Sequence, residues 1–108
     1  MGVDMERYLW KGRIREGKRL EYIERHDHIW PEMTQMLNEA GVHNYSIWLI
    51  GDELIGYYEC ENVGIANRYQ ADSLINQKWD EFMADVMYME TDPDTGCEWL
   101  CQEVFYHP

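Results

Sequence analysis

The sequence predicts a single α+β domain over residues 1–108, in which helices pack on one face of an antiparallel sheet. A chain of 108 residues has the length of one small domain with a modest core. Hydrophobic residues make up 45% of it, which is typical of a globular protein. The spacing of apolar residues indicates, in order, a strand, helices, two strands, a helix and a strand. This order is that of a ferredoxin-like fold.

The first strand and the first helix carry their apolar residues at different spacings. Residues 6–14 are predicted as a strand, because Tyr8, Trp10 and Gly12 fall on one side of it. The segment that follows, at about 18–29, has the apolar spacing of a helix. We expect its core-facing stripe to consist of Leu20, Ile23 and Trp30.

Proline and glycine set the limits of a second helix. Pro31 begins it, since proline is well tolerated at a first helical position, and it extends to Ala40. Gly41 is a typical residue just after a helix end. The segments Val42–Ile50 and Glu53–Glu61 follow as a strand pair that turns at a Gly-Asp dipeptide.

The strand at Val42–Ile50 carries apolar side chains on both of its faces. Helices on one side of the sheet would leave the other face in contact with water, and large exposed apolar surfaces are rare in monomers. In a chain this small, we therefore expect a second copy of the chain to cover that face. The apolar residues that the strand distributes over its two faces are Tyr45, Ile47, Trp48 and Leu49.

The C-terminal half is predicted to contain two helices, a loop and a last strand. Residues 63–71 form a short helix, and a stronger helix extends over about 73–87. A polar loop at Thr91–Gly96 and a strand at Trp99–Tyr106 complete the domain. The apolar residues at helical spacing in the stronger helix are Ile75, Trp79, Phe82, Met83 and Val86.

Composition excludes some partners and favours others. The net charge of −12, from 21 acidic and 9 basic residues, argues against binding to nucleic acid or an anionic membrane. Five tryptophans and eight tyrosines are many for this length and indicate a ligand pocket, an interface or both. The three cysteines fit no disulfide framework, and the first residues lack the apolar run of a signal peptide. We therefore expect free thiols and a cytoplasmic location.

Tyr22 and His26 are candidates for acid–base chemistry. Residues four apart lie on the same face of a helix, so a phenol and an imidazole can point into one pocket. A helical histidine is more often a surface or core-edge residue, although its near-neutral pKa makes it recur in catalysis. His26 and His28 diverge by roughly 200° on a helix and cannot chelate a metal well. With His43 and His107 scattered elsewhere in the sequence, we expect no metal site.

Trp79 has two interpretations. It lies on the apolar stripe of the stronger helix, where simple core packing explains it. Tryptophan faces also hold neutral sugars against their C–H surface, so a pocket that combines an indole with a phenol and an imidazole would suit a sugar. Spacing does not decide between the two. The neighbouring acidic group of Asp80, Glu81 and Asp85 is typical of a solvated helix face.

Four separated segments of the chain match one known family in the right order, which is far more specific than any single match. They are Tyr22-x-x-x-His26-Asp-x-Ile-Trp30-Pro31-Glu32, His43-Asn44-Tyr45-Ser-Ile, Gln77-Lys78-Trp79 and Gln102-Glu103-Val104-Phe105-Tyr106. Through them the chain resembles the L-rhamnose mutarotase family, essentially from Arg7 to Pro108.

The resemblance implies a fold, an activity and a set of site residues. The fold would be a dimeric α+β barrel, in which two ferredoxin-like sheets pack face to face. The activity would be interconversion of the α and β anomers of L-rhamnose in the cytoplasm, on a monosaccharide and without cofactor or metal. His26 matches the family's catalytic proton donor, and Tyr22 and Tyr45 match tyrosines that contact the substrate. Trp79 matches the first of two adjacent tryptophans that line the sugar.

One position departs from the family pattern. Asp80 stands where the second tryptophan is often found, and a carboxylate cannot replace an indole face. It could bond to a sugar hydroxyl instead, so we include Asp80 among the substrate-binding residues. The departure leaves L-fucose open as an alternative substrate.

The base that acts opposite His26 also stays open among Asp27, Asp80, water and a hydroxyl group. A ligand-binding protein or mono-oxygenase on the same fold is a second alternative, and a purely structural dimer without a pocket is a third.

Overall fold

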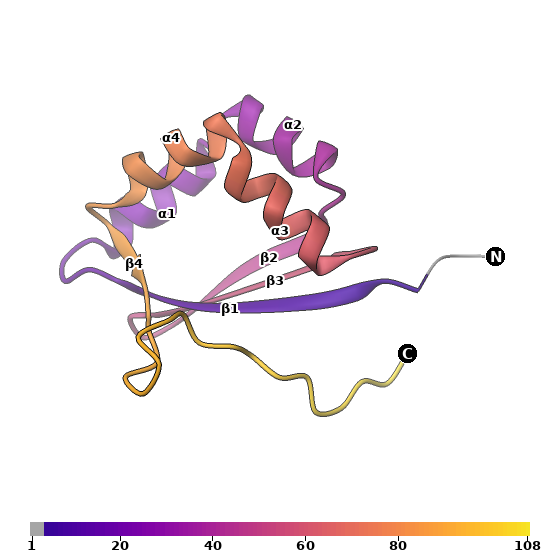
Figure 1. Ribbon diagram of the computed structural model, residues 1–108. Helices are drawn as coiled ribbons and strands as arrows, with labels where there is room; N and C mark the ends of the chain where they lie inside the picture. Colours follow the sequence, from indigo (N-terminus) through magenta and orange to yellow (C-terminus); the bar gives the residue numbers. More distant parts are fainter. Residues whose placement is uncertain (1–3) are drawn as a thin grey trace.

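The computed structural model describes residues 4–108 as an antiparallel sheet of four strands with four helices on one face (Figure 1). The strands lie in the order β2-β3-β1-β4, which is ferredoxin-like. The prediction of an α+β fold with helices on one face is confirmed. In chain order the elements are β1 (Glu6–Ile14), α1 (Arg19–Asp27), α2 (Pro31–Glu39), β2 (His43–Ile50), β3 (Glu53–Cys60), α3 (Val63–Asp72), α4 (Leu74–Met83) and β4 (Met87–Met89).

The central strands β1 and β3 are paired along nearly their whole length, and their register places Trp10 opposite Gly56. Successive side chains of a strand point to opposite faces. Tyr8 and Trp10 accordingly pack toward the helices, whereas Leu9 is exposed on the outer face of the sheet. The predicted strand at residues 6–14 is confirmed together with its two faces.

The core lies between the sheet and the helices in two adjoining clusters. Cys60 is buried in the smaller cluster, and Cys97 and Cys101 are exposed; all three are free thiols, as predicted. None of the helices within residues 4–108 is long and apolar enough to cross a membrane. The buried residues of the larger cluster are Ile14, Tyr22, Met33, Met36, Leu54, Trp79, Met83 and Val86.

Leu20 and Ile23 do not belong to the core, so this part of the predicted stripe on α1 is wrong, whereas Trp30 packs against the larger cluster. Leu20 is 81% and Ile23 38% exposed, whereas Tyr22 is only 4% exposed. Two residues on a helix are separated by roughly 200° around the axis, so a helix that buries Tyr22 turns Leu20 toward water. The helix is therefore anchored by an aromatic residue with a polar end.

The second helix follows its sequence signals. α2 begins at Pro31 and buries Met33 and Met36. Gly41 adopts a φ of 78°, the left-handed conformation that glycine tolerates after a helix end. Both predicted limits of this helix are confirmed within one residue.

The last strand lies elsewhere than predicted. α4 ends at Met83, and Met87–Met89 forms β4 beside Gly12–Ile14 of β1. Val86 is fully buried although it follows the helix, so an apolar residue at helical spacing extended the predicted helix too far. The predicted strand at Trp99–Tyr106 is wrong, because this segment pairs with no strand.

The C-terminal segment instead crosses the face of the sheet that carries no helices (Figure 1). Side chains hold it there: Arg7 of β1 pairs with Glu103 at 2.6 Å, and its guanidinium stacks 3.5 Å above the ring of Tyr106. Leu100, Val104 and Phe105 nevertheless remain largely exposed. The outer face of the sheet is thus only partly covered.

Candidate functional site

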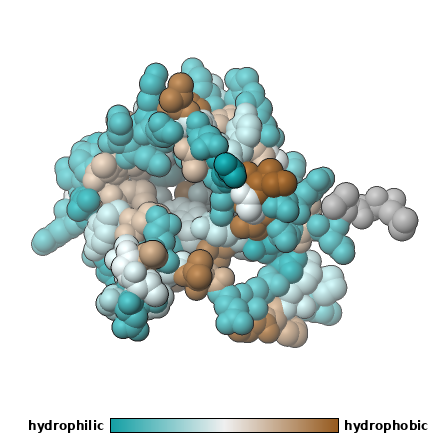
Figure 2. All heavy atoms as spheres, viewed as in Figure 1, coloured by the Kyte–Doolittle hydropathy of each residue, from teal (hydrophilic) through white to brown (hydrophobic). Residues whose placement is uncertain are grey.

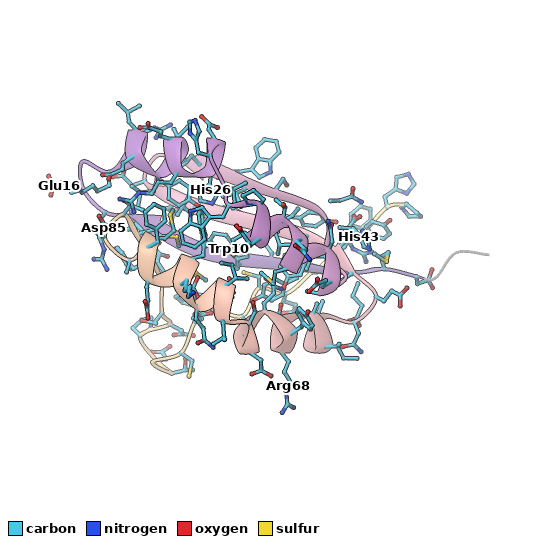
Figure 3. The ribbon with its side chains drawn as sticks, turned by 90° about the horizontal axis from the view of Figure 1, so that it is seen from above. Trp10, Glu16, His26, His43, Arg68 and Asp85 are labelled. Carbon is cyan, nitrogen blue, oxygen red and sulfur yellow. The ribbon has the colours of Figure 1, made fainter. Side chains whose placement is uncertain are left out.

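A cavity of about 940 Å³ lies between the helices and the sheet and is lined partly by residues of the core. In Figure 2 the molecule is hollowed between its helical layer and the sheet. Figure 3, seen from the helix side, shows His26 and Trp10 in the space between α1 and α4. The structure brings all five sequence-predicted site residues into the lining of this one cavity: Tyr22, His26, Tyr45, Trp79 and Asp80.

His26 is held by its own helix. Its Nδ1 lies 3.1 Å from the carbonyl oxygen of Tyr22, an acceptor that assigns the ring proton to Nδ1. Nε2 is then the ring nitrogen available to exchange a proton with a ligand. Partial burial lowers the pKa of His26 below its ordinary value of 6.5, because it disfavours the imidazolium form. The hydrogen bond to Tyr22 and the charge of Asp27 oppose this shift.

Tyr22 carries a buried hydroxyl that lacks a partner. Within residues 4–108, its Oη is shielded from solvent and makes no hydrogen bond. Burial raises the pKa of this phenol, so it stays protonated. The Tyr22 ring lies 4.4 Å from that of His26, which confirms the predicted pairing on one helix face. Because buried polar groups are normally hydrogen-bonded, the hydroxyl indicates a place for a polar ligand.

Tyr45 reaches the cavity because it lies on the same face of β2 as Ile47 and Leu49, which pack against the core. The pairing of β2 with β3 shifts register between His43 and Ser46, and Asn44 there has a φ of 49°. This irregularity shifts the pairing of His43, whereas Ser46–Ile50 keep a regular register with β3. Tyr45 points toward the helices, and its Oη accepts a hydrogen bond of 2.9 Å from Nε1 of Trp10. Burial raises the pKa of Tyr45 as well.

Aromatic rings form the wall of the cavity on the α4 side. Trp79 is 7% exposed and meets both His26 and Trp30 edge to face, at centroid distances of 5.5 and 5.0 Å. Edge-to-face contacts are a preferred arrangement of aromatic rings. Trp79 therefore fits both interpretations of its position, because it packs in the core and also lines the cavity.

Asp80 lies at the open side of the cavity and not merely on a solvated helix face. Desolvation by the surrounding protein raises the pKa of its carboxyl, and the nearby Glu98 adds to this by charge repulsion. Asp85, which belongs to the same acidic group in the sequence, points elsewhere and pairs with Arg25 at 2.8 Å. Asp80 is thus the member of that group placed to contact a ligand.

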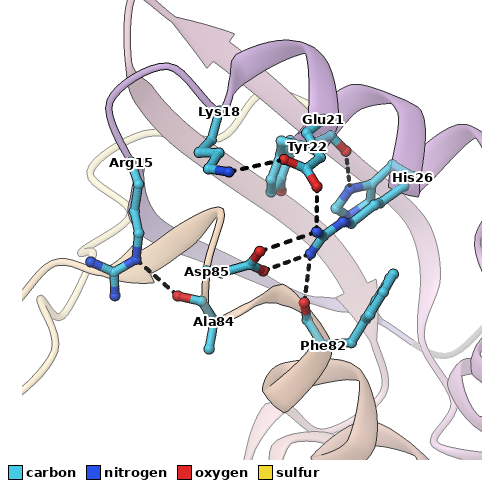
Figure 4. Close-up of polar contacts among 9 residues, drawn as sticks. Arg15, Lys18, Glu21, Tyr22, His26, Phe82, Ala84 and Asp85 are labelled. Carbon is cyan, nitrogen blue, oxygen red and sulfur yellow. Dashed lines mark hydrogen bonds and ion pairs between the residues drawn. The ribbon is translucent and has the colours of Figure 1, made fainter.

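Arg25 ties α1 to the end of α4 (Figure 4). Its guanidinium donates hydrogen bonds to the carbonyl oxygen of Phe82 at 2.6 Å and to the Asp85 carboxylate at 2.8 Å. It also pairs with Glu21 one turn earlier at 2.6 Å. These contacts fix the helix that carries His26 against the helix that carries Trp79.

The two histidines of the H-x-H sequence point in different directions. His28 bonds to the Glu24 carbonyl at 3.0 Å, in the same way as His26 bonds to Tyr22, but it is exposed and lies outside the cavity. The described part of the chain contains no group of three or more His, Cys, Asp or Glu side chains arranged to hold a metal ion.

Fold and site together define a ferredoxin-like α+β protein with an aromatic pocket equipped for acid–base chemistry on a small polar ligand. The sequence profile of the L-rhamnose mutarotase family matches residues 7–107. The chain belongs to this family.

Individual relatives agree with the family match. An L-rhamnose mutarotase from Lachnoclostridium phytofermentans is 41% identical over 94 residues, covering 85% of this chain and 88% of the relative. One from Formosa agariphila is 36% identical over 104 residues, covering 94% and 98%. The crystal structure of an L-rhamnose mutarotase from Formosa agariphila superposes with a TM-score of 0.77 at 33% identity, covering 95% of this chain and 99% of that one.

The two tyrosines of the cavity should respond oppositely to loss of their hydroxyl groups. Tyr22→Phe removes an unpartnered buried hydroxyl and is expected to raise the free energy of unfolding by about 1 kcal/mol. Tyr45→Phe breaks a hydrogen bond and leaves the Trp10 N–H unpaired, so it should lower that free energy by about 1 kcal/mol. Urea unfolding of the sugar-free protein measures both. Destabilisation by Tyr22→Phe would contradict the unpartnered state of its hydroxyl.

Proposed function

We propose that this protein interconverts the α and β anomers of L-rhamnose, the activity named for its relatives. The observation that carries the proposal is the meeting of an imidazole, an unpartnered phenol and an indole in one cavity. A neutral monosaccharide has the hydroxyl groups to satisfy the phenol and the C–H surface to pack against the indole. The net charge of −12 does not oppose such a ligand.

The reaction is an acid–base process in both directions. A proton is delivered to the ring oxygen and another leaves the anomeric hydroxyl, so the C1–O5 bond breaks and the aldehyde forms. Rotation about C1–C2 and the reverse proton transfers close the ring on the other face. Positioned acid–base groups typically accelerate such steps by ~10²–10⁴-fold.

Each cavity residue has a proposed part in this cycle. His26 donates its proton to the ring oxygen and recovers it on closure. The hydroxyls of Tyr22 and Tyr45 orient the sugar through hydrogen bonds, and Trp79 packs against its apolar surface. Asp80, at the open side of the cavity, accepts a hydrogen bond from a sugar hydroxyl.

Replacement of His26 tests the proton donor. We expect His26→Ala to lower the L-rhamnose anomer exchange rate at least ~10²-fold, the lower end of acid–base contributions. NMR saturation transfer between the anomeric protons measures that rate. His28→Ala is the matched control, because His28 has the same backbone hydrogen bond outside the cavity; it should exchange at the wild-type rate.

Other results would lead to other assignments. Full activity in His26→Ala would remove the proton-donor role. Exchange of L-fucose without exchange of L-rhamnose would make the protein a mutarotase for another 6-deoxy sugar. Absence of exchange with any sugar would contradict the enzymatic function and favour a ligand-binding protein.

The pH profile carries the signature of His26. Only the imidazolium form can donate a proton, and burial lowers its pKa below 6.5. The value of kcat/KM, which reports the free enzyme, should therefore fall about tenfold per pH unit as pH rises above that lowered pKa. Saturation transfer between pH 5 and 8 measures the profile after subtraction of the uncatalysed rate. A profile that rises with pH would make His26 a base in the ring-opening step.

We also propose that the protein is a cytoplasmic homodimer that packs through the outer face of the sheet. Trp48 is 64% exposed and Ile50 63% exposed on that face, and the apolar side chains of the C-terminal segment lie beside it. Removal of such apolar surface from water favours association. The exposed, unpaired thiols of Cys97 and Cys101 fit a reducing compartment.

Sedimentation velocity tests the dimer. The wild type should sediment as twice the 13.0 kDa chain. Trp48→Lys should shift the protein toward the monomer, since it places a charge in the proposed interface. Leu20→Lys, at a leucine on the helix side that is even more exposed than Trp48, should stay dimeric. A monomeric wild type at micromolar concentration would contradict the proposal.

A further inference from the structure

Trp10 occupies a place that the sheet makes for it. It lies on the helix side of β1, directly opposite Gly56 of β3. A Cβ atom on Gly56 would lie 2.0 Å from Cε2 and Nε1 of the indole, far inside van der Waals contact. A Cβ on Gly12 would lie 3.2 Å from Cζ3. The indole therefore rests against strand backbone that only glycine leaves open.

The position of the indole determines what the Tyr45 hydroxyl can do. Nε1 of Trp10 is a donor only, and it donates to Oη of Tyr45 at 2.9 Å. A tyrosine hydroxyl that accepts one hydrogen bond keeps its own O–H to donate. The described residues provide no acceptor for this O–H, and Tyr45 lines the cavity. Its proton is thus available to a ligand.

We propose that Trp10 is a positioning residue for the sugar, a role that rests on the proposed function. Its indole forms the floor of the cavity on the sheet side. Its N–H holds Tyr45 in the orientation that donates a hydrogen bond to a ring or hydroxyl oxygen of the substrate. Trp10 lines the cavity together with Tyr22, Tyr45 and Trp79, so it is also placed to contact the apolar side of the sugar.

The proposal predicts that the effect of Trp10 on binding passes through Tyr45. Trp10→Phe keeps an aromatic floor but removes the N–H. It should raise KM for L-rhamnose about fivefold, the scale of one hydrogen bond, with kcat within about twofold of wild type. Tyr45→Phe should raise KM by a similar factor, because it removes the donating hydroxyl itself.

A double-mutant cycle separates this role from a structural one. In the Tyr45→Phe background the indole N–H has nothing to orient, so Trp10→Phe should change KM less than about twofold. If the two factors multiply instead, Trp10 acts independently of Tyr45 and the proposal is overturned. An unchanged KM in Trp10→Phe alone would overturn it as well. Saturation transfer at a series of sugar concentrations gives both kinetic constants.

Gly56→Ala displaces the indole without altering its chemistry. The added Cβ would overlap the Trp10 indole and force it away from β3, so KM for L-rhamnose should rise at least as much as in Trp10→Phe. Thermal unfolding shows whether each variant is folded. If Gly56→Ala does not fold, the Trp10–Tyr45 double-mutant cycle alone decides whether Trp10 positions Tyr45. A folded Gly56→Ala variant with wild-type KM would show that packing of the indole against Gly56 is not needed for sugar binding.

Trp48→Phe is the matched control for loss of an indole N–H. Trp48 donates to the Ser46 hydroxyl at 3.0 Å on the outer face of the sheet, outside the cavity. The KM of Trp48→Phe should equal that of wild type.

If the wild-type protein exchanges no L-rhamnose, both the proposed function and this inference are contradicted. If wild type is active and the cycle is multiplicative, only the role of Trp10 fails.

Discussion

The site depends on the antiparallel pairing of β1 with β3, which sets Trp10 over Gly56. From this position the indole N–H reaches Tyr45, which lies on the helix-facing side of β2 together with Ile47 and Leu49. A sheet usually presents a closely packed face to its helices. Here an aromatic floor and a polar rim leave a cavity of about 940 Å³ between the layers.

The helices supply the chemistry, and their mutual position is fixed by charge-assisted hydrogen bonds. Arg25 connects α1 to the last turn of α4, next to the helix face that bears His26 and one turn beyond Trp79. Such bonds are shorter and stronger than neutral ones. His26 itself is held by a hydrogen bond to the carbonyl oxygen of Tyr22, and its imidazole and the unpartnered phenol both line the cavity.

Local signals in the sequence predicted much of this arrangement. The spacing of Tyr22 and His26 implied a shared pocket, and proline and glycine marked the limits of α2, because helix geometry is set within a few residues. Features that need two distant segments escaped prediction. The packing of the Trp10 indole requires Gly56 on another strand. The strand that pairs with the other edge of β1 is Met87–Met89 and not the predicted Trp99–Tyr106. The roles of His26, Tyr22, Tyr45, Trp79 and Asp80 stay proposals, although all of them line one cavity.

A crystal structure with L-rhamnose bound tests the central claim most directly. The account predicts a sugar between Trp10 and Trp79, with the Tyr22 hydroxyl hydrogen-bonded to it and Nε2 of His26 within hydrogen-bonding distance of the ring oxygen. The Tyr45 hydroxyl should donate to the sugar while it still accepts from Trp10. A sugar bound outside the cavity, or one that leaves the Tyr22 hydroxyl unpartnered and Nε2 far from the ring oxygen, would contradict the account.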